Sequence, residues 1–472
     1  MPLILGANSI TGGYEVDNSL RFNSGSSDYL SRSLGASETS IQRGTFSFWV
    51  KRSSLTSASS EMIYSNEVAD DNNRGFIQFE DNDSFRMVDT AGGVNQLQLK
   101  TNRLFRDVSA WYHIVVAIDT TQSTASDRLK IYINGVQETS FSTETYPDQN
   151  DNLKLLEGGQ TDKNLIGLNY GGSAYFGGYL AEFVYIDGTQ NAVTDFGEFD
   201  EDSEIWKPID VYGLTFGNNG FYLEFKDSSA LGDDTSGNGN DWTVNNLTSI
   251  DQTTDTPTNN FCTLNPLQSG SITFSDGNLT QGNTSATGQN AISTIGASSG
   301  KWYAEVKCTA VGSNGTLVGF VNLNLSNLQN ESIAPGQDNF SAGLYSNNGP
   351  IFYQSETTFA TVGGTSDGDI IQLAMDLDNG YLYWGRNGTW LNSADPESGG
   401  VGTGGLATSN LGLGDIGFGM WQRNSASASW NYGNAPYTIT TGNEDANGYG
   451  NFEYAVPSGY YALCTANLAE FG

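Results

Sequence analysis

The feature that most constrains the fold is a period-two alternation of apolar and polar residues along much of the 472-residue chain. Residues 45–51, 129–133 and 369–378 each place their apolar side chains on one face of an extended segment. Asn134-Gly135 then supplies the sequence of a tight hairpin turn. No segment carries an apolar repeat of 3.6 residues over three turns, which excludes coiled coils and helical bundles. The sequence therefore predicts an all-β protein.

Turn residues divide this β-rich sequence into modules. Strand patterns thin out after residue 210, and residues 227–242 consist almost entirely of Gly, Asn, Asp, Ser and other turn formers. Strand patterns resume after residue 260. We therefore expect two β-sandwich (jelly-roll) domains at 1–209 and 261–472, joined by a turn-rich, Gly/Asn-rich connector at 210–260.

Composition excludes several classes of protein. Aromatic residues make up 12% of the chain, whereas disordered segments are poor in them, so the chain is expected to fold. Asp and Glu number 53 against 20 Lys and Arg, which gives a net charge of -33. This charge repels nucleic-acid phosphates and anionic lipids, and no basic cluster offsets it locally. We expect neither nucleic-acid binding nor membrane insertion.

Targeting segments and cysteine chemistry are not expected either. Residues 1–7 lack the basic region and the apolar run of a secretory signal. Cys262, Cys308 and Cys464 are odd in number and far apart, so they indicate neither a disulfide framework nor a Cys-x-x-Cys metal site. With His113 as the single histidine, a histidine-ligated zinc site or a histidine-base hydrolase is not expected.

The first module resembles the concanavalin A-like lectin domains of the laminin-G/pentraxin type. Four stretches carry this resemblance in the order and spacing of that family: residues 46–51, 111–119, 129–135 and 178–188. The resemblance implies that these stretches are strands of a two-sheet jelly roll. The second module resembles a SPRY domain, itself a compact β-sandwich, through residues 300–306, 368–378, 383–390 and 431–437.

The pairing of the modules resembles structural proteins of marine tailed phages. This resemblance lies in four stretches of the chain, residues 1–9, 19–29, 234–246 and 256–261. It implies a component of the virion surface without indicating which one. A polar β-protein with few lysines is compatible with that place, because it is soluble and offers a trypsin-like protease few sites.

One loop contains a candidate metal site. The candidate ligands are Asp234, Ser236 and Asn238. They stand at positions one, three and five of the loop and are followed by Gly239, an arrangement that resembles the start of a calcium loop. Position twelve holds Asn245 instead of the closing Glu. Asp and Asn in turns also bond their own backbone, so a purely structural turn is the alternative. Ca²⁺ is the one cofactor that the sequence suggests.

A glycine-rich loop contains the candidate ligand-binding residues. Residues 170–178 contain four glycines and one alanine, and among these lie Tyr170, Tyr175 and Phe176. Aromatic rings stack on the apolar faces of sugars, and loops of this kind often bind ligands. The alternative is a hairpin whose aromatic side chains cover the edge of a sheet.

The carboxylate pair of a glycanase is not evident. A retaining enzyme needs two carboxylates about 5–5.5 Å apart across the scissile bond. The acidic residues of 198–204 follow the last expected strand of the module. Glu182 lies on an expected strand, but the residue two positions later, which would share its face, is Val184 and not a second carboxylate. His113 shares a face with Trp111 and is expected to pack in the core.

The sequence thus predicts a non-enzymatic phage virion surface protein, a compact tail-fibre or tail-associated appendage that contributes to binding of host-surface glycans. A capsid decoration or head-fibre protein is the first alternative, and a glycan depolymerase is the second. The expected partners are other virion proteins, further copies of the chain in a homo-oligomer, and host-surface glycans.

Overall fold

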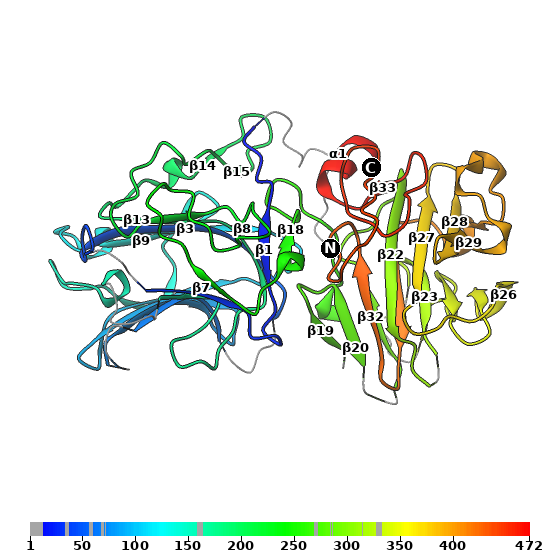
Figure 1. Ribbon diagram of the computed structural model, residues 1–472, viewed down its shortest axis with the longest axis horizontal. Helices are drawn as coiled ribbons and strands as arrows, with labels where there is room; N and C mark the ends of the chain where they lie inside the picture. The colour runs from blue at the N-terminus through cyan, green and yellow to red at the C-terminus, as the bar shows by residue number, and fades with distance from the viewer. Residues whose placement is uncertain are drawn as a thin grey trace. The chain divides into compact units, whose positions relative to one another are not determined.

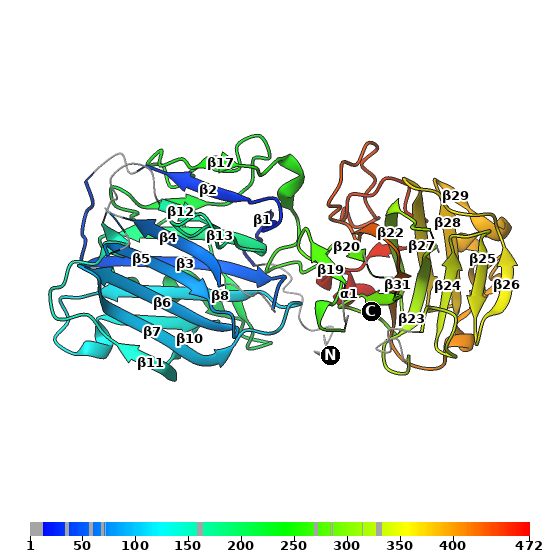
Figure 2. The ribbon, with the colours of Figure 1, turned by 90° about the horizontal axis from the view of Figure 1, so that it is seen from below.

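The computed structural model describes residues 13–33, 37–55, 60–67, 70, 72–157, 164–268, 272–283, 285, 287–313, 315–326 and 333–472. Residues 1–9, which carry part of the resemblance to phage proteins, lie outside this set. The chain forms two compact units, an N-terminal unit (Ile10–Thr258) and a C-terminal unit (Asn259–Gly472). Both are built almost entirely of antiparallel sheets (Figures 1 and 2), so the prediction of an all-β protein with two β-sandwich domains is confirmed.

The N-terminal unit consists of two large sheets that face each other, seen edge-on as two layers in Figure 1. The first sheet contains, in spatial order, β10 (Val136–Glu138), β9 (Leu129–Ile133), β8 (Tyr112–Asp119), β3 (Arg43–Arg52), β13 (Gly178–Asp187), β1 (Ser19–Phe22) and β18 (Gln252–Thr253), with β16 (Phe221–Leu223) also paired to β13. The second contains β11 (Phe141–Thr145), β7 (Val94–Leu104), β6 (Ser84–Ala91), β5 (Arg74–Phe79), β4 (Glu61–Glu67), β12 (Asn164–Ile166), β2 (Tyr29–Arg32) and β17 (Thr243–Asn245).

Short elements complete this unit. A two-stranded sheet contains β14 (Gly197–Phe199) and β15 (Trp206–Pro208), and the 3₁₀ turns are η1 (Ala125–Asp127), η2 (Lys154–Leu156), η3 (Val193–Asp195) and η4 (Ser249–Asp251).

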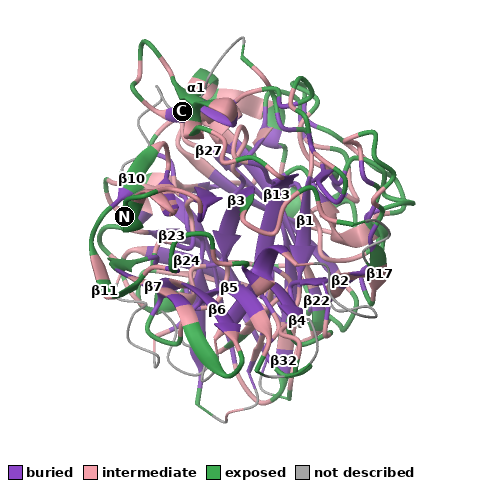
Figure 3. Ribbon diagram, turned by 90° about the vertical axis from the view of Figure 1, so that its left-hand side faces the viewer, coloured by how far each residue is buried: buried purple, intermediate pink, exposed green. Residues whose placement is uncertain are grey.

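The core of the N-terminal unit lies between its two sheets. The strand β3 contributes Phe46, Phe48 and Val50, all fully buried, as the alternation over 45–51 requires. Phe48 stacks on Phe183 of β13 with 5.1 Å between the ring centroids. In Figure 3 these central strands are buried, while exposed residues gather on loops and on outer strands such as β10 and β17.

The outer face of the first sheet is covered as well, and residues 210–258 supply part of the cover. The segment predicted as a connector adds β16, β17 and β18 to the two sheets of the N-terminal unit. Lys51 Nζ on β3 lies 2.7 Å from Asp255 Oδ2, and the Trp111 indole donates to Asp255 Oδ1 at 3.1 Å. This segment is therefore part of the first sandwich in the structure, and the two units meet in sequence after Thr258.

The C-terminal unit also contains two large sheets. One contains β19 (Thr273–Ser275), β20 (Thr280–Asn283), β32 (Ala426–Asn431), β22 (Lys301–Ala310), β27 (Ile370–Asp376), β28 (Tyr381–Arg386) and β29 (Thr389–Trp390), with β30 (Leu406–Ala407) on β28 and β33 (Tyr461–Ala462) on β22. The other contains β21 (Gln289–Ile292), β31 (Ile416–Gln422), β23 (Leu317–Asn322), β24 (Ser341–Tyr345), β25 (Pro350–Tyr353) and β26 (Thr357–Thr361).

Aromatic residues fill the core of the C-terminal unit. Trp302, Trp384 and Trp430 are at most 2% exposed, and Phe320 packs edge-on against Trp384. Burial of each such side chain stabilises a fold by a few kcal/mol, about 3 at most. The unit also contains the 3₁₀ segments η5 (Pro266–Gln268), η6 (Leu391–Ser393), η7 (Pro396–Val401) and η8 (Thr408–Leu411), and ends in the helix α1 (Thr465–Phe471).

Two hairpin turns have the backbone that their Asn-Gly sequences predict. Asn134 and Gly135 both have positive φ, at 48° and 78°, and Asn387 and Gly388 do so at 50° and 80°. This is the type I′ geometry, which suits the twist of the flanking strands. Among the described residues, no helix is long and apolar enough to cross a membrane.

Candidate functional site

The loop that resembles a calcium site is held by hydrogen bonds to Asp234. The Asp234 side chain is buried, and its Oδ1 accepts the backbone N–H groups of Tyr222 and Ser236, each at 2.9 Å. Its Oδ2 accepts the Ser236 hydroxyl and the backbone N–H of Asn240, each at 2.8 Å. The carboxylate thus ties the loop to β16 and acts as the acceptor of a structural turn.

The other two residues of this candidate metal site also have partners of their own. Ser236 Oγ accepts the backbone N–H of Asn238 at 3.2 Å. The Asn238 amide donates to the carbonyls of Gly217 and Gly220, at 2.7 and 2.9 Å. No cluster of three or more His, Cys, Asp or Glu side chains in the described ranges could hold a metal ion. Calcium binding by this loop stays a hypothesis.

The three candidate ligand-binding aromatics of residues 170–178 do not form one surface. Phe176 is fully buried and packs on Phe22 in the core, with ring centroids 5.9 Å apart. Tyr175 and Tyr170 are half-buried; the Tyr175 ring lies 6.4 Å from the Tyr29 ring, and the Arg74 guanidinium lies 4.8 Å from the Tyr170 ring. Of the three candidates, the loop therefore leaves only the two half-buried tyrosines for a ligand.

The single histidine is a core residue. His113 is 1% exposed and stacks on Trp49 at 4.7 Å. The indole N–H of Trp206 donates to His113 Nδ1 at 2.9 Å, so Nε2 carries the proton toward Ser47 Oγ, also at 2.9 Å. Burial lowers the pKa of His113 to about 3, which keeps the imidazole neutral.

The carboxylates that a glycanase would need are engaged or enclosed. In the acidic loop, Lys207 pairs with both Glu198 and Asp200, at 3.3 and 3.2 Å. Glu182 is 7% exposed and accepts hydrogen bonds from the hydroxyls of Tyr14 and Tyr222. Burial raises its pKa to about 7.

Glu182 was not singled out as a site from the sequence, although its backbone is unusual. It lies at a β-bulge of β13 with φ at 49°, a left-handed conformation that costs a non-glycine residue free energy. Its tyrosine partners are 168 and 40 residues away in the chain, so local sequence carried no signal for the cluster.

An aromatic groove on the C-terminal unit brings together residues that the sequence analysis did not identify. Trp421 on β31 and Tyr345 on β24 both stand opposite Leu317 of the intervening strand β23. Since residues that stand opposite each other share a face of the sheet, these three side chains form one row. Phe352 on β25 lies beside the row, 6.2 Å from the Tyr345 ring. The space that they border measures about 250 Å³.

The floor of this groove is the face of the sheet turned away from the core. The neighbouring residues Val318, Leu344 and Met420 point inward and are buried. Gly343 on the outer face lies under the segment that carries Ala334. A Cβ at this glycine would lie 2.9 Å from the carbonyl oxygen of Pro335, so only glycine fits there.

Polar side chains form the rim of the aromatic groove. The Gln337 amide donates to Glu356 Oε1 at 2.6 Å, and both side chains are exposed. On the other side, the Arg423 guanidinium lies 5.0 Å from the centre of the Trp421 ring. The groove thus combines an aromatic floor with amide, carboxylate and guanidinium groups around it, a composition typical of ligand sites.

Comparison with known proteins supports the assignment of the first sandwich. Residues 23–193 match the family model of the concanavalin A-like lectin/glucanases superfamily, laminin G type. The first sandwich is therefore similar to concanavalin A-like lectin domains over residues 23–193, which agrees with the resemblance expected for the first module. No curated protein sequence matches the chain.

Similarity to solved structures is weak. A putative carbohydrate binding protein from Bacteroides ovatus is 16% identical, with a TM-score of 0.31, over 49% of this chain and 59% of that one. A human SPRY domain is 13% identical, with a TM-score of 0.27, over 36% of this chain and 99% of that one. A heptameric pentraxin from Limulus polyphemus is 12% identical, with a TM-score of 0.26, over 38% of this chain and 80% of that one. These scores carry no argument about function, and the SPRY assignment of the C-terminal unit stays a prediction.

Proposed function

We propose that this protein is a non-enzymatic glycan-binding component of a phage virion surface, a compact tail-fibre or tail-associated appendage. The aromatic groove of the C-terminal unit is the observation that carries the binding function. The lectin-type family match of residues 23–193, in the other unit, supports glycan binding by the protein in general. The placement on a virion rests on the resemblance of residues 1–9, 19–29, 234–246 and 256–261 to phage structural proteins.

The chemistry of the aromatic groove fits a sugar ring. A pyranose has an apolar face of C–H groups, which packs on aromatic side chains; the half-buried Tyr345 and Phe352 are the rings available here, since Trp421 is 9% exposed. Its hydroxyls both donate and accept hydrogen bonds, and the rim residues Gln337 and Glu356 supply both kinds of partner. At about 250 Å³, the groove is close to the lower limit of roughly 300 Å³ for small-molecule pockets, a size for one or two sugar units.

The arrangement of carboxylates supports a role in binding without hydrolysis. Among the described residues that line the groove, Glu356 supplies the one carboxylate. Glycoside hydrolysis ordinarily requires two carboxylates on either side of the scissile bond. In the N-terminal unit, Lys207 engages Glu198 and Asp200, and tyrosine hydroxyls enclose Glu182.

Binding is tested by isothermal titration with oligosaccharides released from the host-surface polysaccharide. We expect Tyr345→Ala and Phe352→Ala to weaken binding by about tenfold each, since a stacked aromatic contributes about 1 kcal/mol beyond its burial. Phe199→Ala is the matched control, because Phe199 is 48% exposed in the other unit and should leave binding unchanged. Equal affinities in all three variants would refute glycan binding by the groove.

Two further measurements address the alternatives. Reducing-sugar release from the polysaccharide above a boiled control would replace the binding role with a depolymerase. Immunogold labelling of whole particles distinguishes the tail appendage from a capsid decoration or head-fibre protein, and particles without label would contradict a virion role altogether.

Self-association is part of the proposal. Edge strands need cover or charge to avoid uncontrolled pairing. The edge strand β10 exposes 56% of Val136. We expect copies of the chain, or other virion proteins, to cover such edges. A monodisperse monomer in light scattering at high concentration would contradict association between copies.

A further inference from the structure

One arginine on the rim of the aromatic groove has no carboxylate partner. Arg423 follows the strand β31, is half-buried, and holds its guanidinium 5.0 Å from the centre of the Trp421 ring. Its side chain forms neither an ion pair nor a hydrogen bond with any described residue. The chain has 53 acidic side chains for 20 basic ones, so a cation on the rim of a groove without a carboxylate beside it points to a partner from outside the chain.

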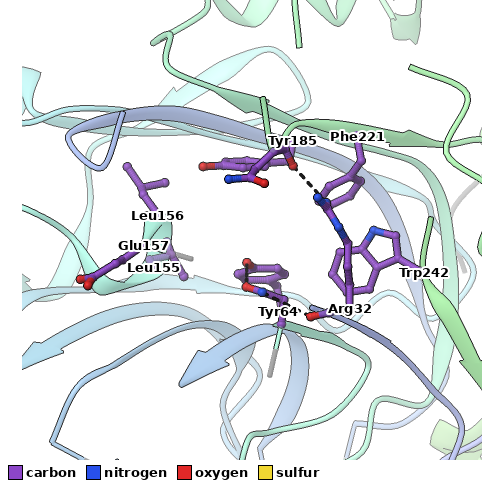
Figure 4. A pocket seen from close by; sticks show the side chains of 10 residues that line it. Arg32, Tyr64, Leu155, Leu156, Glu157, Tyr185, Phe221 and Trp242 are labelled. Atoms are coloured by element: carbon purple, nitrogen blue, oxygen red, sulfur yellow. Dashed lines mark hydrogen bonds between the residues drawn. The ribbon is translucent and has the colours of Figure 1, made fainter. Parts of the chain in front are cut away.

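Other arginines of the described chain that lack an ion pair have different partners. Arg128 and Arg386 donate to backbone carbonyls at 2.7 and 2.9 Å. Arg32 is enclosed in the N-terminal unit (Figure 4), where it donates to the carbonyl of Asn219 at 3.0 Å. The space beside Arg32 measures about 10 Å³, the room of one water. Arg423 differs because it borders a space of about 250 Å³.

The Trp421 ring fixes the position of the Arg423 guanidinium. Trp421 is 9% exposed, and a Cβ at Gly288 would lie 2.0 Å from its Cζ2 atom, so the indole rests directly on the glycine. A cation over the face of an indole is stabilised by about 0.5–1 kcal/mol at a partly exposed site. This contact uses the face of the guanidinium and leaves its N–H donors available. An arginine presents these donors as a fork that matches the two oxygens of a carboxylate.

The aromatic groove keeps its two charged side chains apart. Among the described lining residues, Arg423 is the one cation and Glu356 the one carboxylate. Arg423 follows β31 and Glu356 follows β25, with β23 and β24 between them, so three spacings of roughly 4.8 Å separate their strands. The lining as a whole is close to neutral. A ligand that spans it nevertheless meets a cationic donor at one end and an anionic acceptor at the other.

The available aromatic rings lie toward the Glu356 end of the groove. Tyr345 is on β24 and Phe352 is on β25, the strand that leads to Glu356. Tyr345 and Trp421 stand on either side of Leu317, two strand spacings or about 10 Å apart. A sugar ring stacked on Tyr345 and Phe352 therefore leaves room for an adjoining sugar unit that reaches Arg423.

We propose that the aromatic groove selects an acidic glycan, and that Arg423 determines this selectivity by binding the carboxylate of a sugar acid. The inference rests on the proposed glycan binding and names the ligand class. One sugar unit stacks on Tyr345 and Phe352, and its hydroxyls bind Gln337 and Glu356. The adjoining unit presents its carboxylate to Arg423. The opposite orientation is excluded, because it would place the sugar carboxylate against Glu356.

The net charge of the chain does not prevent this binding. A charge of -33 repels anions at long range. At physiological ionic strength, however, exposed charges farther apart than a Debye length of about 8 Å are largely screened. The guanidinium in direct contact with the ligand therefore decides whether a single carboxylate binds.

The test titrates the whole protein with two forms of the same ligand. Oligosaccharides released from the host-surface polysaccharide are used before and after their carboxyl groups are reduced to alcohols. Reduction keeps the rings and their linkages and removes the charge. The wild-type affinity should fall about tenfold or more on reduction, the loss expected for hydrogen bonds to a charged group.

Variants assign this selectivity to Arg423. Arg423→Gln should weaken binding of the acidic form about tenfold and leave binding of the reduced form unchanged, whereas Arg423→Lys should retain part of the preference because it keeps the charge. Lys307→Gln is the matched control. It removes a cation that lies 4.9 Å from the Tyr437 ring on the other sheet of the same unit, and it should change neither affinity.

Loss of acid selectivity is distinguishable from loss of glycan binding. If neither form binds wild type, the proposed glycan binding is wrong, and the acid selectivity is wrong with it. If both forms bind wild type equally, or if Arg423→Gln weakens both by the same factor, the groove still binds glycans and the role of Arg423 in selectivity alone is refuted. An effect on folding would also weaken both forms equally, so the ratio of the two affinities isolates the charge.

Discussion

Replacement of Asp234 by alanine tests the reading of its loop as a structural turn. The carboxylate is 7% exposed and accepts three backbone N–H groups and one hydroxyl within 2.9 Å. Asp234→Ala leaves these donors without their acceptor. The Tyr222 N–H is buried in β16, where an unsatisfied donor costs about 1–3 kcal/mol.

The other donors of this network limit the total effect. The N–H groups of Ser236 and Asn240 are partly buried and can bond water in the variant, at a cost below about 1 kcal/mol each. We therefore expect Asp234→Ala to reduce the free energy of unfolding by about 2–4 kcal/mol. The neighbouring carboxylate Asp233 is exposed, and Asp233→Ala should change the free energy of unfolding by at most about 0.5 kcal/mol.

Urea unfolding of wild type and both variants, each in calcium chloride and in EDTA, measures this difference. The structural turn predicts a loss for Asp234→Ala that is the same in both solutions, and a wild type that is insensitive to EDTA. Equal stabilities of the Asp233 and Asp234 variants would refute the hydrogen-bond reasoning. A wild type stabilised by calcium, with a loss for Asp234→Ala in calcium alone, would show that the loop binds the metal.

Two other predictions concern buried groups of the N-terminal unit. Burial raises the pKa of Glu182 to about 7 from 4.5, so the folded state holds its proton more tightly and stability falls as pH rises through that interval. Glu182→Gln should therefore gain about 2–4 kcal/mol over wild type between pH 4.5 and pH 8 in urea unfolding; a difference independent of pH would contradict this. Phe176→Ala should lower the free energy of unfolding by about 3–5 kcal/mol in the same assay without weakening glycan binding. Tyr175→Ala should lower it by less than about 1 kcal/mol. A loss of glycan affinity in either variant would place the ligand site in the loop of residues 170–178.

The strands could be predicted from sequence because their cause is local. Alternation over 129–133 places Leu129, Ile131 and Ile133 inward, and all three are at most 2% exposed. Asn134-Gly135 then turns the chain because glycine and asparagine tolerate positive φ. Fold class follows from such segments alone.

The cover on the first sheet could not be predicted, because its causes are distant in sequence. Residues 210–258 have turn composition, yet the Lys51–Asp255 pair, 204 residues apart, ties them to β3. Burial of Lys51 at 1% exposure contradicts the expectation that a lysine on the outer face of a strand is solvated. Only the partner explains it.

The aromatic groove escaped prediction for a similar reason. Trp421, Leu317 and Tyr345 come from three strands, and only the register between those strands places them in one row. Proximity in the chain instead favours the aromatics at 170–176, of which the fold buries Phe176.

The most direct test of glycan binding by the aromatic groove is a crystal structure of the protein with a bound host-surface oligosaccharide. The proposal predicts sugar density stacked on Tyr345 and Phe352, with hydroxyls in contact with Gln337 or Glu356. Sugar bound on the N-terminal unit instead, at Tyr170 or Tyr175 or elsewhere on the lectin-type domain, would contradict the account.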